Sequence, residues 1–136
     1  MWIGPRLRFA VICAALASAV VTTGALGACT SGGGRPEATA RLQILSPTAG
    51  HVAGQDVDLR LRLIGGRLVA LTTKAVRANE GHIHVFVDDK LVSMTKGLDQ
   101  DLRMTPGTHG VRAEFVAADH APFKHPVVAA VIFRVH

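Results

Sequence analysis

A regular alternation of apolar and charged residues most limits what this chain can fold into. Side chains of a β-strand point alternately to opposite faces, so one apolar face and one polar face indicate a half-buried strand of an antiparallel sheet. The alternation runs from Asp56 to Leu63, with Val57, Leu59, Leu61 and Leu63 on one face and Asp58, Arg60 and Arg62 on the other.

Short segments of similar character follow one another along residues 41–136, separated by Gly-, Pro- and Asp-containing turns. The sequence predicts strands at 41–45, 56–63, 67–73, 82–87, 91–94, 98–104, 109–116 and 127–135. Residues 73–79 are the one competing helical segment, which is short and contains β-branched residues. Seven or eight short strands at this spacing predict an all-β fold, an immunoglobulin-like antiparallel β-sandwich of about seven strands.

The N-terminus has the features of an export signal. Arg6 and Arg8 precede an apolar run over 9–21, and the sequence Leu-Gly-Ala-Cys ends at Cys29. This order predicts a lipoprotein signal peptide over residues 1–28, cleaved before a lipidated Cys29. A plain signal peptide or a single membrane span is the alternative. Residues 29–40 are small, polar and Gly-rich, which predicts a flexible linker.

Removal of the signal peptide changes the composition. The mature chain would have 108 of the 136 residues, and its net charge would fall from +5 to +3 because Arg6 and Arg8 are lost. Cys13 would also leave, so a lipidated Cys29 could form no disulfide. The chain has no Tyr, its one Trp is Trp2, and the mature basic residues form no cluster. Nucleic-acid binding, which uses aromatic platforms and a basic groove, is therefore not expected.

The sequence shows no constellation typical of catalysis. Ser31, Ser46 and Ser93 lie outside any Gly-x-Ser-x-Gly motif, and neither HExxH nor a phosphate-binding Gly-rich loop is present. We therefore expect that the protein is not an enzyme.

Histidine is the remaining chemical feature, with seven residues in the chain. His82 and His84 share one face of a predicted strand at a spacing that one metal ion could bridge. His109 and His120, with Asp119, are candidates for the further ligands of a Cu(II) or Zn(II) ion. The alternative is structural: His109 and His120 brace loops through backbone carbonyls, and His82 and His84 lie on an exposed sheet face. The alternation of strand side chains favours this alternative. If Ile83 points into the core, His82 and His84 point outward, whereas an inward Val111 would place His109 at the core end of its strand, away from their surface.

Three segments resemble one bacterial family. They are GHIHVFVDD at Gly81–Asp89, PGTHGVRAEF at Pro106–Phe115 and ADHAPFKHPV at Ala118–Val127. Together they are similar to exported immunoglobulin-like sandwich proteins with Gly-His-x-His and Pro-Gly-x-His motifs, a family without an established activity. The resemblance implies the sandwich fold and an extracytoplasmic location.

These observations predict a lipoprotein held on the extracytoplasmic face of the cell membrane. It would serve as a non-catalytic binding or accessory module of the envelope, with another envelope protein as its partner. A copper- or zinc-binding protein that uses His82, His84, His109 and His120 is the alternative function.

Overall fold

A computed structural model describes residues 33–94 and 97–136. The predicted signal peptide, Cys29 and the start of the linker lie outside these residues. Within them the secondary structure is β-strand, and no helix there is long and apolar enough to cross a membrane.

The strands follow the predicted order closely, and seven of those in the described residues are at least four residues long. These seven are β1 (Arg41–Ser46), β3 (Asp56–Ile64), β5 (Glu80–Val87), β6 (Lys90–Ser93), β7 (Asp99–Arg103), β8 (Gly107–Ala117) and β9 (Val127–Val135). Two strands of two residues, β2 (Val52–Ala53) and β4 (Arg67–Leu68), complete the described set.

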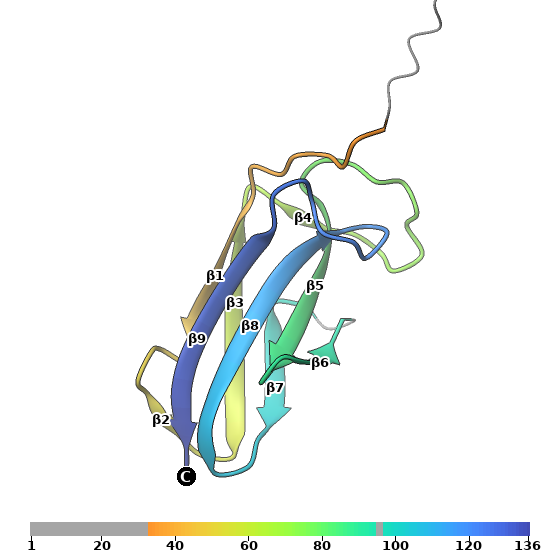
Figure 1. Cartoon of the computed structure of the whole chain (residues 1–136). Coiled ribbons are helices and arrows are strands. Elements are labelled where there is room, and N and C mark those ends of the chain that lie inside the picture. The colour runs from red at the N-terminus through yellow and green to blue at the C-terminus, as the bar shows by residue number, and fades with distance from the viewer. Residues whose placement is uncertain (1–32, 95–96) are drawn as a thin grey trace, which may run out of the picture. The chain divides into compact units, whose positions relative to one another are not determined.

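The strands form two sheets that pack face to face (Figure 1). The small sheet has the order β1-β3-β7 and is antiparallel throughout. The large sheet has the order β2-β9-β8-β5-β4, with β6 also paired to β5. Its long pairs are antiparallel, and only the two-residue strands β2 and β4 pair in parallel. The predicted immunoglobulin-like antiparallel β-sandwich is thus confirmed.

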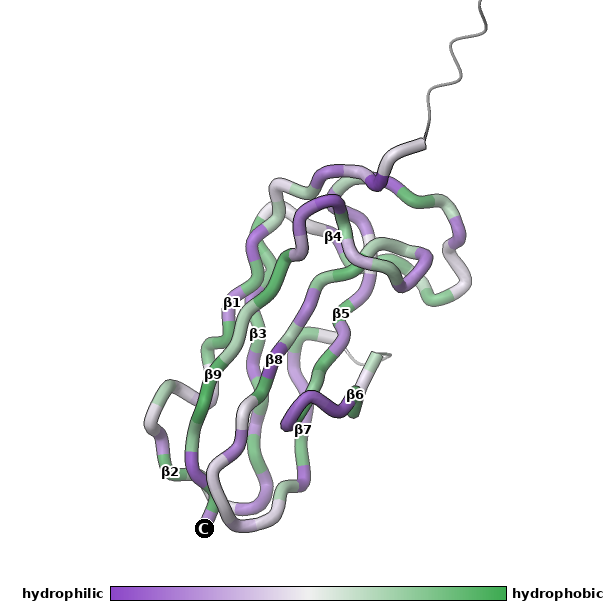
Figure 2. Tube along the Cα trace, viewed as in Figure 1, coloured by the Kyte–Doolittle hydropathy of each residue, from purple (hydrophilic) through white to green (hydrophobic). Residues whose placement is uncertain are grey.

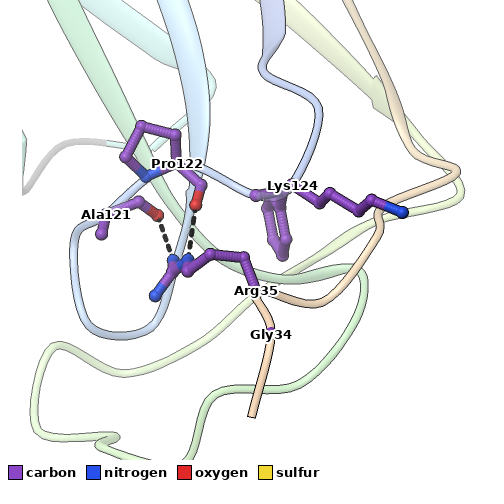
Figure 3. Close-up of a pocket in the computed structure, with 6 residues that line it drawn as sticks. Gly34, Arg35, Ala121, Pro122 and Lys124 are labelled. Atoms are coloured by element: carbon purple, nitrogen blue, oxygen red, sulfur yellow. Dashed lines mark hydrogen bonds between the residues drawn. The ribbon is translucent and has the colours of Figure 1, made fainter. Parts of the chain in front are cut away.

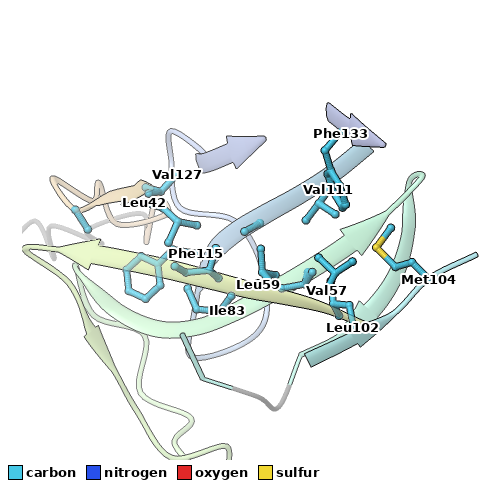
Figure 4. Packing of buried hydrophobic residues seen from close by; sticks show 14 of the residues in the cluster. Leu42, Val57, Leu59, Ile83, Leu102, Met104, Val111, Phe115, Val127 and Phe133 are labelled. Carbon is cyan, nitrogen blue, oxygen red and sulfur yellow. The ribbon is translucent and has the colours of Figure 1, made fainter. Parts of the chain in front are cut away.

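Alternation along the strands builds the core between the sheets. Val57, Leu59 and Leu61 of β3 are each at most 5% exposed, whereas the charged residues between them face solvent. The opposing sheet contributes fully buried Phe115 and Phe133. Figure 2 shows the alternation of apolar and polar residues along the chain, and Figure 4 shows the apolar side chains meeting between the sheets. Burial of one face of each sheet stabilises the sandwich.

The backbones of β5 and β8 lie very close together at Gly81, where β5 begins. A Cβ atom on Gly81 would lie 1.7 Å from the carbonyl oxygen of Val116. This position therefore admits only glycine, immediately before His82.

The segment between β4 and β5 differs from the prediction. The strand expected over 67–73 ends at Leu68, and residues 73–79 are not helical. The amide of Thr73 donates to the carbonyl of Ala70 at 2.8 Å, which turns the chain away from β5. Residues 69–79 therefore form a loop, which returns to the sheet at Glu80.

Candidate functional site

His82 and His84 lie on the outer face of the large sheet, yet both are buried. Their neighbours Ile83 and Val85 point into the core, so the predicted outward orientation of the pair is confirmed. Their exposed fractions are only 4% and 8%. The expectation of an exposed sheet face is therefore wrong, because another segment covers this part of the sheet.

The covering segment is the loop between β8 and β9, residues 118–126. Pro122 and Pro126 lack the amide hydrogen that a sheet ladder needs, so the chain leaves the sheet after Ala117. The amide of His120 donates to the carbonyl of Ala117 at 2.8 Å, and the amide of Ala117 donates to the carbonyl of Ala121 at 3.0 Å. His120 adopts a left-handed backbone conformation with φ of 63°. This tight turn places the His120 ring over the strand that carries the other two histidines.

The three imidazoles form a stack, which we call the histidine cluster. The ring centroids of His82 and His120 are 4.5 Å apart with an interplanar angle of 16°, and those of His84 and His120 are 5.4 Å apart at 21°. Nε2 of His84 lies 3.1 Å from Nδ1 of His120, a hydrogen-bond distance. Three of the four predicted site histidines thus come together.

One nitrogen of the cluster has no partner. Nε2 of His82 is buried without a hydrogen bond from the described residues. A buried polar atom left unpaired destabilises the fold, so such an atom requires an explanation. A small pocket of about 80 Å³ adjoins His82, lined by Leu68, Val69, Leu71, His82, Ile83, Met94 and Gly97.

The environment favours neutral imidazoles. Burial lowers the pKa of His82, and repulsion from His120 and Lys74 acts in the same direction, against the backbone groups of Ala118 and Val69. Burial also lowers the pKa of His84, assisted by His120. Glu114 opposes that shift. Neutral imidazole is the form that binds metal ions.

Glu114 is a site residue that our sequence analysis missed. It lies opposite His84 in the β5–β8 register and is 9% exposed. Its Oε2 accepts a hydrogen bond from Nη1 of Arg112 at 3.0 Å, and the Arg112 guanidinium lies 3.8 Å from the centroid of the Phe86 ring. The same alternation that placed Ala113 and Phe115 inward could have placed Glu114 on the outer face beside His84.

Arg35, a residue of the predicted linker, fixes the loop that carries His120. Its guanidinium donates to the carbonyls of Ala121 at 2.7 Å and Pro122 at 2.8 Å (Figure 3), and it pairs with Asp119. The Arg35 guanidinium lowers the pKa of the Asp119 carboxyl through this hydrogen bond. The linker predicted over 29–40 is therefore attached to the domain from Arg35 onward. Asp119 braces the loop here instead of joining the imidazole stack.

His109 lies far from the histidine cluster. It lies seven positions before Val116, the partner of His82, in β8, which corresponds to about 23 Å along the strand. Its Nδ1 is 2.7 Å from Oδ2 of Asp88, and its Nε2 is 2.7 Å from the carbonyl oxygen of Thr105. Asp88 raises the pKa of His109 through the hydrogen bond, with a further contribution from Thr105. His109 therefore braces the β7–β8 turn, as the structural alternative predicted.

The cluster is a set of donors rather than a formed metal centre. Among residues 33–94 and 97–136, no group of three or more His, Cys, Asp or Glu side chains is arranged to hold a metal ion. The imidazoles are stacked, so their nitrogens do not meet at one point. Rotation of the rings about their side-chain bonds is needed before three could bind one ion.

Comparison with known proteins identifies no family for this chain. Neither a family model nor a curated protein matches the chain. Among solved structures, the fibronectin(III)-like modules of Clostridium thermocellum CbhA align with 13% identity and a TM-score of 0.47, over 69% of this chain and 94% of that chain.

Proposed function

We propose that the protein is a lipoprotein anchored through Cys29 on the extracytoplasmic face of the cell membrane. In this proposal the sandwich is a non-catalytic binding module for another component of the envelope. The Leu-Gly-Ala-Cys sequence after a basic and apolar N-terminus is the observation that carries the proposal. Two or more acyl chains on one cysteine would hold the domain stably at the membrane.

The attachment of Arg35 limits how far the domain could lie from such an anchor. Five residues separate Cys29 from Arg35. At about 3.6 Å per residue, this length of chain reaches no more than about 22 Å. The end of the sandwich that carries the 118–126 loop would then lie next to the membrane.

Replacement of the anchor cysteine tests this proposal. We expect Cys29→Ala to move the protein from the membrane fraction to the soluble fraction and to abolish incorporation of labelled palmitate. Cys13→Ala is the matched control and should change neither property. Retention of Cys29→Ala in the membrane fraction, without loss of palmitate, would show that Cys29 is not the anchor.

Metal binding is the second candidate function, supported by the short distance between two imidazole nitrogens of the histidine cluster. Two nitrogen ligands about 2.05 Å from one ion lie about 2.9 Å apart at a right angle and about 3.4 Å apart at the tetrahedral angle. The 3.1 Å between His84 Nε2 and His120 Nδ1 falls between these values. His82, with its unpaired Nε2, is the third donor in this proposal. Imidazole donors suit Cu(II) and Zn(II).

Calorimetric titration of the purified protein with Cu(II) or Zn(II) tests this candidate. We expect saturable binding of one ion. His84→Ala or His120→Ala should weaken the affinity more than about a hundredfold, because loss of a residue that only hydrogen-bonds to a metal ligand already costs about 10–100-fold in affinity. His109→Ala is the control and should leave the affinity unchanged. Equal affinity in the His84→Ala variant, or no binding by the unaltered protein, would reject the metal site.

A further inference from the structure

The loop of residues 69–79 lies at the same end of the sandwich as the start of the described chain (Figure 1). The two segments are joined through Asn79. Its Oδ1 accepts hydrogen bonds from the amides of Thr39 at 2.8 Å and Ala40 at 2.9 Å, and its side-chain amide donates to Oγ1 of Thr39 at 3.1 Å. The described part of the chain therefore begins close to this loop.

The loop combines two exposed cations with two exposed apolar side chains. Lys74 and Arg77 are exposed, and residues 69–79 contain no Asp or Glu. Leu71 is 43% exposed and Val76 is 38% exposed. Such a mixture is typical of segments that lie at a lipid headgroup boundary, where apolar side chains enter the interface and basic ones reach phosphate.

The salt bridges at this end of the described domain do not include these two cations. Three other basic side chains are paired there, Arg35 with Asp119, Arg67 with Glu80 and Lys124 with Glu37, whereas Arg41 at the start of β1 is exposed and forms no salt bridge within the described residues. Neither Lys74 nor Arg77 forms a salt bridge with any residue in the described part of the chain. The positive charge without a salt bridge at this end therefore resides on the loop and on Arg41, which follows the Thr39–Ala40 segment bound by Asn79.

We infer that the 69–79 loop rests on the anionic headgroups of the membrane that holds the anchor. This inference rests on the proposed lipidation of Cys29, which would keep the end of the domain within about 22 Å of the bilayer. Lys74 and Arg77 contact lipid phosphate, and Leu71 and Val76 enter the headgroup layer. The domain then stands with this end down and with β2 and the C-terminus away from the membrane.

A matched pair of tryptophan variants tests the inference. The mature chain has no tryptophan, so Val76→Trp introduces a single reporter in the loop. Val52→Trp is the control, because Val52 is also exposed, at 53%, but lies in β2 near the C-terminal end. The mature protein is attached to phosphatidylglycerol vesicles by its own lipid or, if Cys29 is a free thiol, by coupling that thiol to a maleimide lipid. Binding of the protein to vesicles without maleimide coupling tests the lipid anchor, whereas quenching of the tryptophan tests contact between the loop and the membrane.

We expect headgroup spin-labelled lipid to quench Val76→Trp at least about threefold more strongly than Val52→Trp. Adding Lys74→Glu and Arg77→Glu to the Val76→Trp variant should reduce binding of the loop at least about tenfold, since each cation near an anionic surface contributes about a fivefold effect. Phosphatidylcholine vesicles or high salt should likewise abolish the stronger quenching of Val76→Trp relative to Val52→Trp. Equal quenching of the two tryptophans, or quenching insensitive to the charge reversal, would overturn the inference. A loop that binds a protein partner and not lipid would give equal quenching of the two tryptophans.

Discussion

The histidine cluster and His109 show how differently one residue type is used in one small domain. His109 has a partner for each ring nitrogen, Asp88 on one side and the carbonyl of Thr105 on the other. In the cluster, the hydrogen-bond partner of His84 is another imidazole, and Nε2 of His82 has no partner among the described residues. Charged and carbonyl partners stabilise the protonated ring of His109, while burial against other imidazoles disfavours protonation of His82 and His84.

The difference separates a structural histidine from a chemically available one. A ring whose two nitrogens are both hydrogen-bonded within the fold has no lone pair to offer a ligand. A neutral imidazole keeps a lone pair on one of its two nitrogens, and a buried nitrogen without a partner in the described residues destabilises the fold slightly. The histidine cluster therefore provides the donors for which we propose a metal ion, and His109 does not.

The largest expected difference between the two sites concerns the glycine beside each. Gly81→Ala would force a Cβ against the Val116 carbonyl oxygen, so we expect loss of about 3 kcal/mol or more of unfolding free energy. Gly110 is next to His109, and a Cβ there meets nothing within 4 Å. Gly110→Ala should change stability by less than about 1 kcal/mol. Urea unfolding measures both, and equal losses would contradict the close approach at Gly81.

Removing each imidazole should have effects of opposite sign. His109→Leu loses two hydrogen bonds, so we expect destabilisation by about 1–2 kcal/mol. His82→Leu removes the unpaired Nε2 and keeps an apolar side chain of similar volume in the buried site, so stability should be unchanged or higher by up to about 1 kcal/mol. Metal-free protein is compared by urea unfolding. A His82→Leu variant less stable than His109→Leu would mean that the cluster contributes more to the fold than its hydrogen bonds indicate.

The smallest expected effect is the pH dependence of the Asp88–His109 pair. The pKa of His109 is raised above 6.5, so its contribution is complete below that pH and is lost as pH rises through the folded pKa. The pKa of Asp88 is lowered below 3.8, so its contribution is lost as pH falls through the folded value. The pair should therefore stabilise most between about pH 4 and 6.5, by less than about 1 kcal/mol because Asp88 is half exposed.

Asp88→Asn is the variant that isolates this contribution. It should flatten the stability profile over that pH range and return the His109 titration, followed by NMR, toward its ordinary value. An unchanged His109 titration in Asp88→Asn would show that Thr105, and not Asp88, controls the ring.

Strand periodicity was enough to predict most of the fold. Alternation gave β3 to within one residue, and it gave the outward orientation of His82 and His84, because both follow from the two-residue period of a strand. It failed over 67–73, where the sequence suggested a longer strand but a turn at Ala70–Thr73 carries the chain off the sheet. Strand β2 was missed because two residues are too few to show a period.

The histidine cluster needed information that no local pattern contains. Periodicity places His84 on an outer face, but burial of that face depends on where the 118–126 loop folds back. The contacts that fix this loop come from Arg35, which is 84 residues from Asp119 in the chain. Arg35 itself lies in a Gly-rich stretch whose composition predicts flexibility. A long-range contact from such a stretch has no signature in the sequence around either residue.

The attachment of Arg35 and Asn79 also determines how the domain bears mechanical load. Force applied to the chain at residue 33 acts first on the hydrogen bonds of Arg35 to the 118–126 loop and on the bond from the Lys124 amide to the Pro36 carbonyl, and next on those of Asn79 to Thr39 and Ala40. Strand β1 is loaded only after these bonds have broken. A pull from the N-terminal side would therefore loosen the turn that carries His120 while the sandwich stays intact, so tension on the chain would reach the histidine cluster before it reached the core.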